Sequence, residues 1–140
     1  MMAQACAFNA VPVCTLYDTL TPEALATTLA EARVPAIYVN ADLLPNIVEA
    51  LIVGATRTRQ LHRAMNLEQE ASVRIQLRMV VFDGTADEEC LRALVSYGVK
   101  FMAFDDLRQL GKKFPVKARK ANRDDVFCCM WTSGGSKSRV

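Results

Sequence analysis

The stretch L-R-M-V-V-F-D-G-T-A-D-E-E-C-L-R-A-L-V-S-Y-G-V-K-F-M-A-F, residues 77–104, decides the fold class of this chain. Its first six residues are mostly apolar and Asp83-Gly84 ends the run, which predicts a strand over 77–82. Thr85-x-x-Glu88 has the spacing of a capping box, and the helix that it opens ends at Gly98. A second strand is predicted over 100–104. A strand, a helix and a strand at this spacing predict a parallel βαβ unit.

The same alternation continues toward both ends of the chain. Thr21 is predicted to cap a helix with Pro22 at its first position, and apolar residues at helical spacing predict another helix that Gly54 breaks. The segment 56–76 is polar and basic and is interpreted as a helix or a long excursion. We therefore expect an α/β fold with alternating strands and helices and a mostly parallel sheet. The further strands are predicted over 11–16, 36–39 and 126–131, and the further helices over 2–10 and 106–110.

Composition limits the class of protein. With 140 residues, 51% of them hydrophobic, the chain suits one globular domain, and 17 basic against 15 acidic residues do not indicate a nucleic-acid binder. Five cysteines without a C-x-x-C pair favour a reducing compartment. The first residues lack the basic region of a secretory signal, and no apolar run approaches the roughly 18 residues that span a bilayer. We expect an intracellular protein, cytoplasmic or peripheral on a membrane.

The sharpest candidate for chemistry is the loop T-S-G-G-S-K-S, residues 132–138, directly after an apolar strand. Glycines let backbone N–H groups approach phosphate oxygens, hydroxyls add donors, and a lysine adds positive charge. The alternative is a Gly/Ser-rich tail at a chain end. A Walker loop does not fit. The candidate nucleotide-binding residues are Thr132, Ser133, Gly134, Gly135, Ser136 and Lys137.

Two segments carry a resemblance to a known family. D-V-F-C-C-M-W-T-S-G, residues 125–134, resembles the strand and loop of adenylate-forming (AMP-binding) enzymes, where an apolar strand precedes T-S-G-[ST]-T-G-x-P-K-G. V-C-T-L-Y-D-T-L, residues 13–20, resembles the V-x-L-Y-x-T-L-G segment of the long-chain fatty acyl-CoA synthetases. Leu107-x-x-Leu110-Gly111 resembles the short helix before the linker to the loop. These anchors lie in the family's order along the chain.

The resemblance implies a long-chain fatty acid–CoA ligase. In that family a fatty acid carboxylate attacks ATP in the presence of Mg²⁺, and the CoA thiol then attacks the acyl-adenylate. The chain would be part of the large N-terminal domain, residues 1–140, with a basic linker over 111–124 and a phosphate-loop-like tail over 132–140. The family lies at endoplasmic reticulum, peroxisome or mitochondrial surfaces. We expect a truncated form, inactive alone, that carries no catalytic residue and no protein metal ligand.

The loop departs from the family pattern. Gly135 stands where the family has Ser or Thr, Ser136 replaces Thr, Lys137 falls where the family has Gly, and Arg139 falls where it has Pro. A deletion would instead bring Lys137 toward the motif lysine. The sequence is compatible with both alignments, or registers, of Lys137 with the family motif.

The remaining candidates are interpreted structurally. His62 is expected on a solvated helix, Cys128 and Cys129 in buried packing, Asp105-Asp106 at a helix cap, and Asp124-Asp125 before a strand. A second hypothesis is a non-catalytic α/β module that contacts a protein partner or an anionic membrane through a basic run, whereas nucleic acid is not expected. The basic run comprises Lys112, Lys113, Lys117, Arg119, Lys120 and Arg123.

Overall fold

A computed structural model describes residues 2–63, 74–119 and 121–131 of the chain. These residues belong to two compact units. Thr19–Pro115 form the central unit, and Met1–Asp18 together with Val116–Val140 form the terminal unit. The two units are described separately below.

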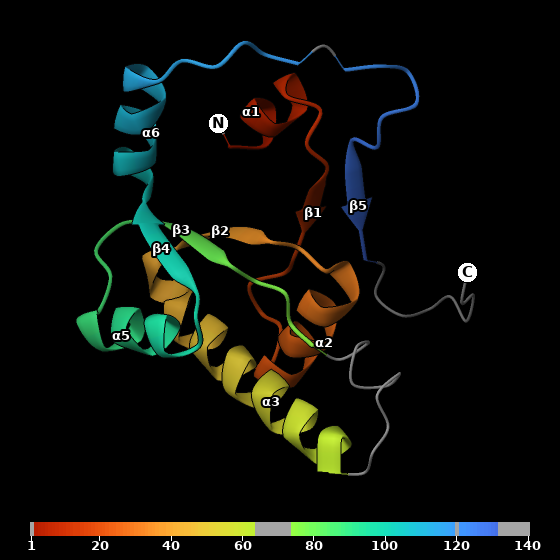
Figure 1. Cartoon of the computed structure of the whole chain (residues 1–140), viewed down its shortest axis with the longest axis vertical. Coiled ribbons are helices and arrows are strands. Elements are labelled where there is room, and N and C mark those ends of the chain that lie inside the picture. The colour runs from red at the N-terminus through yellow and green to blue at the C-terminus, as the bar shows by residue number, and fades with distance from the viewer. Residues whose placement is uncertain (1, 64–73, 120, 132–140) are drawn as a thin grey trace. The chain divides into compact units, whose positions relative to one another are not determined.

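The central unit is built on a three-stranded parallel sheet (Figure 1). Its strands are β2 (Ala36–Asn40), β3 (Met79–Asp83) and β4 (Lys100–Ala103), in the order β2-β3-β4. The register pairs Val81 of β3 with Tyr38 of β2 and with Met102 of β4. As the central strand, β3 buries three consecutive side chains, from Val80 to Phe82, which is typical of a strand covered on both faces. The predicted parallel α/β fold is confirmed.

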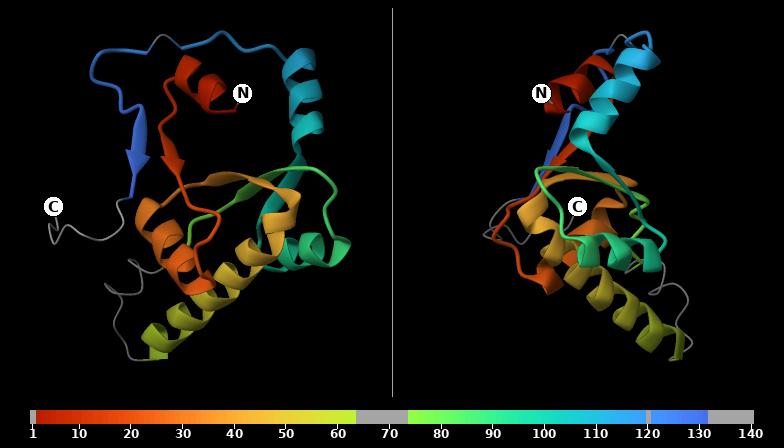
Figure 2. Two further views of the ribbon diagram at one scale, coloured as in Figure 1. Left: turned by 180° about the vertical axis from the view of Figure 1, so that it is seen from behind. Right: turned by 90° about the vertical axis from the view of Figure 1, so that its left-hand side faces the viewer.

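Helices α3 (Leu44–Arg63) and α5 (Glu88–Ser96) connect the strands. The connections from β2 to β3 and from β3 to β4 both move one strand in the same direction across the sheet. Right-handed connections of this kind place their helices on the same face of the sheet. Figures 1 and 2 show α2 (Pro22–Ala32), α3 and α5 together on that side. The core lies there, because α2 packs on α3 and α3 packs on α5. Its most buried large side chains are Leu29, Leu44, Ile47, Val80 and Leu94.

The start of α2 follows its sequence signals. The Thr21 hydroxyl accepts a hydrogen bond from the N–H of Ala24 at 3.3 Å, and Pro22 occupies the first turn, where its missing N–H costs no helical bond. Arg33 ends the helix in the left-handed conformation, with φ of 50°. The predicted cap at Thr21 is confirmed.

Gly54 does not break α3, contrary to the sequence prediction. The helix runs from Leu44 through the buried Gly54 to Arg63, after a short 3₁₀ turn at Ala41–Leu43. A Cβ at position 54 would lie 2.7 Å from Cδ1 of Ile75, so the glycine provides room for that side chain. Packing against Ile75, rather than helix termination, explains this residue. Within the segment predicted as a helix or an excursion, residues 56–63 are helical and residues 74–76 are not.

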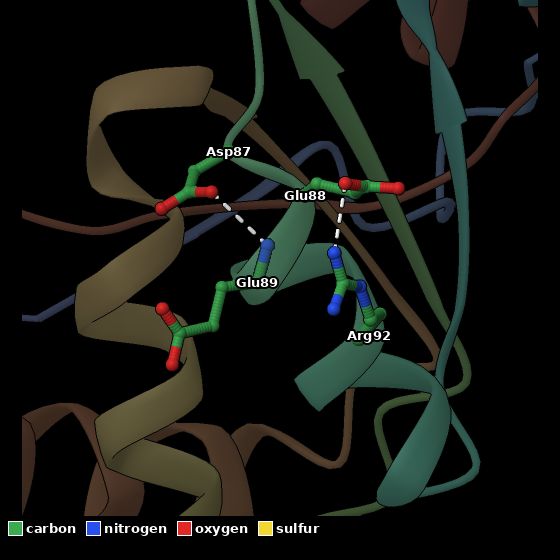
Figure 3. Close-up of polar contacts among 4 residues, drawn as sticks. All are labelled: Asp87, Glu88, Glu89 and Arg92. Atoms are coloured by element: carbon green, nitrogen blue, oxygen red, sulfur yellow. Dashed lines mark hydrogen bonds and ion pairs between the residues drawn. The ribbon is translucent and has the colours of Figure 1, made fainter.

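Helix α5 is capped by Asp87 and not by the predicted Thr85 box. Figure 3 shows the Asp87 carboxylate accepting a hydrogen bond from the N–H of Glu89 at 3.0 Å, and Glu88 pairing with Arg92 one turn later at 2.8 Å. Asp87 directly precedes the first helical residue, and aspartate is among the preferred N-cap residues. Asp87 therefore caps the helix in place of Thr85. At the other end, Gly98 has φ of 74° and follows the helix as predicted.

Helix α6 (Phe104–Lys113) is longer than the predicted segment 106–110. It packs against β3 and β4, and the Phe104 ring meets Tyr38 of β2 edge-on at 5.3 Å between centroids. Ala103 precedes the helix without a capping side chain, and Asp105 and Asp106 lie in the first turn, at the positive end of the helix dipole. The first three residues of the predicted linker, 111–113, belong to this helix.

The terminal unit contains helix α1 (Met2–Phe8) and two strands, β1 (Val13–Thr15) and β5 (Cys128–Met130). The strands form a separate two-stranded parallel sheet. The Asn9 side chain donates to the carbonyl of Ala5 at 2.8 Å as α1 ends, within the segment 2–10 that was predicted as a helix. Across both units, none of the described helices is long and apolar enough to cross a membrane.

Candidate functional site

The described residues that precede the candidate loop in sequence belong to the two-stranded sheet of the terminal unit. The register joins Val13 to Cys128, Cys14 to Cys129 and Thr15 to Met130. The N–H of Val13 also donates to the carbonyl of Phe127 at 3.1 Å. Because the strands are parallel, both end at the same edge, where ligands bind in open α/β sheets.

Two segments that are far apart in sequence therefore meet. Val13–Thr15, from the segment 13–20, form β1, and Cys128–Met130, from the segment 125–134, form β5. After Thr15, the chain continues into Leu16 and an exposed Tyr17, and after Met130 it continues into a half-buried Trp131. The six predicted phosphate-binding residues come directly after Trp131. Thr132, Ser133, Gly134, Gly135, Ser136 and Lys137 lie outside the described residues, so their assignment stays a prediction.

A turn at residues 122–125 precedes β5. The Asp125 carboxylate accepts a hydrogen bond from the backbone N–H of Asn122 at 2.7 Å, and its other oxygen pairs with Arg119 at 3.3 Å. Asp125 thereby fixes the approach to β5. This agrees with the interpretation of Asp124-Asp125 as a lead-in to a strand. Sequence reasoning did not identify Asp125 as the acceptor of this turn.

Three cysteines lie on this sheet. Cys129 is exposed and Cys128 is half-buried, so the prediction that both are buried is wrong. The reason is that β5 has one neighbouring strand, β1, in a two-stranded sheet, and Phe127 and Met130 beside the cysteines are exposed as well. Cys14 is half-buried, and burial, followed by the neighbouring Cys129, raises the pKa of its thiol. Sequence reasoning missed this neighbourhood, because the pairing of β1 with β5 has no local signal.

The basic run begins on α6 and continues beyond it. Lys112 and Lys113 form its last turn, where positive charge suits the helix dipole, and Lys113 lies 5.4 Å from the centre of the Phe114 ring. Phe114 and Val116 are exposed, at 60% and 81%. Lys117, Arg119 and Arg123 are also exposed, and Lys120 lies outside the described residues. In the central unit the run thus places Lys112 and Lys113 next to exposed Phe114, and in the terminal unit exposed Val116 precedes exposed Lys117.

The other candidate residues named from the sequence, His62 and Asp105, lie on helices of the central unit. His62 is exposed in the last turn of α3, as predicted. Asp105 pairs with Arg108 at 2.9 Å within α6. Within residues 2–63, 74–119 and 121–131, no group of three or more His, Cys, Asp or Glu side chains could hold a metal ion.

Comparison with known proteins gives three related enzymes. The chain is 27% identical over 136 residues to long-chain-fatty-acid–CoA ligase 2 of Schizosaccharomyces pombe, a match that covers 96% of this chain and 17% of the relative. It is 24% identical over 128 residues to long-chain-fatty-acid–CoA ligase 1 of Saccharomyces cerevisiae, covering 90% of this chain and 18% of the relative. Ligase 1 of S. pombe is 25% identical over 138 residues, with 97% and 17% covered.

These matches confirm the resemblance predicted from residues 13–20 and 125–134. The chain is a distant homologue of long-chain fatty acid–CoA ligases over nearly all of its length, and it spans less than a fifth of the length of these relatives. No family model matches the chain. No solved structure matches it.

Proposed function

We propose, from this distant homology, that the chain forms part of the ATP-binding domain of a long-chain fatty acid–CoA ligase. The observation that carries the proposal is the pairing of two sequence segments that resemble the family. Residues 13–15 and 128–130 pair in register as parallel strands, and the chain after the second strand is the candidate phosphate loop. The substrates would be a long-chain fatty acid, ATP with Mg²⁺, and CoA.

The residue types of the loop fit a polyphosphate. Hydroxyls of Thr132, Ser133 and Ser136 can donate hydrogen bonds, and the glycines allow backbone N–H groups to come close. The ammonium of Lys137 would offset negative charge as pyrophosphate leaves. In this proposal the loop holds the triphosphate, and groups outside these 140 residues supply the remainder of the ligase site.

Calorimetric titration of the chain with ATP and Mg²⁺ tests the proposal. We expect weak, saturable binding that Lys137→Ala reduces severalfold, since it removes a charge-assisted contact to phosphate. Lys100→Ala is the matched control, because Lys100 is an exposed lysine on β4. No saturable signal would contradict the assignment of the loop, and equal affinity of the Lys137→Ala chain and the unsubstituted chain would contradict a phosphate contact by Lys137.

A second candidate function rests on the basic run. Exposed Phe114 and Val116 lie between Lys113 and Lys117, a combination that suits an anionic lipid surface or an acidic protein partner. In this alternative the chain is a non-catalytic α/β module, and the cations provide most of the attraction, about 1 kcal/mol each at modest salt.

Co-sedimentation with vesicles separates this second candidate from a solvated linker. We expect binding to vesicles that contain phosphatidylserine, weaker binding at high salt, and a severalfold loss with the double substitution Lys113→Glu and Lys117→Glu. Lys100→Glu changes the net charge at a site outside the run and is the control. Binding that does not depend on lipid charge or on salt concentration would argue against membrane binding through the basic run.

A further inference from the structure

Cys14 and Cys129 are opposite each other on the strands of the terminal unit. They are register partners in the parallel pair β1–β5. Side chains of register partners project from the same face of a sheet, and neighbouring strands lie about 4.8 Å apart. That spacing lies within the roughly 4.4–6.8 Å between Cα atoms that a disulfide requires. The backbone therefore places these two thiols where a bond between them can form.

The other cysteines are placed differently. Cys128 pairs with Val13 and, being adjacent to Cys129 on a strand, projects from the opposite face. Cys6 lies in helix α1, and Cys90 lies in helix α5 of the central unit. All five cysteines are free thiols in the structure. Among them, Cys14 and Cys129 alone share a strand register and a sheet face.

The two thiols also differ in access. Cys129 is exposed, so a small reagent can reach it, whereas Cys14 is half-buried. Burial and the neighbouring Cys129 raise the pKa of Cys14, so a smaller fraction of this thiol is present as thiolate. Cys129 is therefore the more accessible of the two thiols.

We propose that Cys14 and Cys129 form a reversible disulfide that ties β1 to β5. The oxidant is a low-molecular-weight disulfide of the glutathione class. The Cys129 thiolate attacks one of its sulfurs, the S–S bond of the reagent breaks, and one small thiol leaves. The Cys14 thiolate then attacks Sγ of Cys129 and displaces the second small thiol. Two electrons pass from the protein to the reagent, and the two cysteine protons balance the two thiols released.

The bond would join the two ends of the chain. Residues 14 and 129 are separated by most of the sequence, so the bond closes a long loop and restricts the unfolded chain. It would also fix the sheet whose carboxyl edge precedes residues 132–137. This inference is independent of the ligase proposal, because it rests on the register of β1 and β5 alone.

The test is disulfide mapping of the full chain after incubation with oxidised glutathione. Free thiols are alkylated, and trypsin then separates residues 1–33, which contain Cys14, from residues 124–137, which contain Cys129. We expect these two peptides to be linked, and the link to disappear on reduction. Under the same conditions in urea, the yield of the link should fall by about tenfold or more, because the folded register supplies the proximity.

Substitutions identify the pair. Cys14→Ser, Cys14→Ala and Cys129→Ser should each abolish the link, whereas the matched variants Cys6→Ser and Cys128→Ser should keep it. A chain with Cys6, Cys90 and Cys128 all replaced by serine should still form it. The proposal is overturned by a link that persists in Cys14→Ala, by a bond between Cys128 and Cys129 within one peptide, or by mixed disulfides alone.

Discussion

At residue 54 the lack of a side chain allows Ile75 to approach helix α3. Replacing Gly54 by leucine would place several atoms where Ile75 already lies, so we expect a loss of about 1–3 kcal/mol in the free energy of unfolding. Urea denaturation followed by circular dichroism measures the loss. Ile52→Leu, at a position of the same helix that is 46% exposed, should change stability by less than about 0.5 kcal/mol. Equal effects of the two substitutions would show that residue 54 is not packed against Ile75.

The Cys14 thiol gives a prediction about pH. Its pKa is raised in the folded chain by burial and by Cys129, so at mildly alkaline pH less of it is thiolate in the folded chain than in the unfolded chain. We expect Cys14 to react with iodoacetamide several times more slowly at pH 8 in buffer than in urea, with the difference shrinking as pH rises above the folded pKa. Peptide mass spectrometry measures the rate. A folded rate equal to that in urea at pH 8 would contradict the burial of Cys14.

At the scale of elements, the cap of α5 distinguishes the structure from the sequence pattern. Asp87 accepts the hydrogen bond from Glu89, so Asp87→Ala should cost about 1 kcal/mol of stability. Thr85→Ala removes the residue that the capping-box spacing selected, and we expect a change of a few tenths of a kcal/mol. Chemical denaturation of both variants provides the comparison. A larger loss of stability for Thr85→Ala than for Asp87→Ala would show that Thr85, and not Asp87, caps the helix.

The elements that sequence predicts well are those with local signals. Thr21-Pro22 marks the start of α2, and Gly98, with its positive φ, marks the end of α5. Gly54 was misjudged because its role depends on Ile75, which is distant in sequence and close in space. Local rules describe caps and turns, and they do not describe contacts between separate elements.

The candidate site shows the same division. The loop 132–137 is visible in the sequence because phosphate binding favours a recognisable set of residue types, and it stays a prediction. The pairing of β1 with β5, and with it the proximity of Cys14 to Cys129, joins opposite ends of the chain. Each strand has three residues, which gives no periodicity from which a partner could be inferred.

At the scale of the whole molecule, exposed apolar side chains predict association. In the terminal unit Phe8, Phe127 and Met130 are 71%, 66% and 74% exposed. Short strands with exposed edges and apolar neighbours favour pairing with other copies. We expect the purified chain to elute from a sizing column as a concentration-dependent mixture with a broad thermal transition. Phe127→Lys should shift it toward monomer, whereas Lys117→Arg should not. A monodisperse monomer with a sharp transition would contradict this prediction.

The last prediction concerns catalysis by the 140 residues alone. Activation of a fatty acid needs groups around the carboxylate, the adenine, the ribose and the leaving pyrophosphate at one site. In the proposed function the candidate loop would supply phosphate contacts only, and no residue of this chain is assigned to the other groups. We therefore expect no pyrophosphate release above background when the chain is mixed with ATP, Mg²⁺ and a long-chain fatty acid.

Weak ATP binding without turnover would agree with a phosphate loop separated from the rest of a ligase site. In the register where the family has glycine, a requirement for positive φ at Lys137 would add a cost on the order of 1 kcal/mol or more for a non-glycine residue. In that register Lys137→Gly should leave ATP affinity unchanged or raise it, whereas in the register that brings Lys137 toward the motif lysine the same change should lower it. Calorimetry on this one variant separates the two registers. Pyrophosphate release above background that Lys137→Ala abolishes would instead show that these residues suffice for the first step of the reaction.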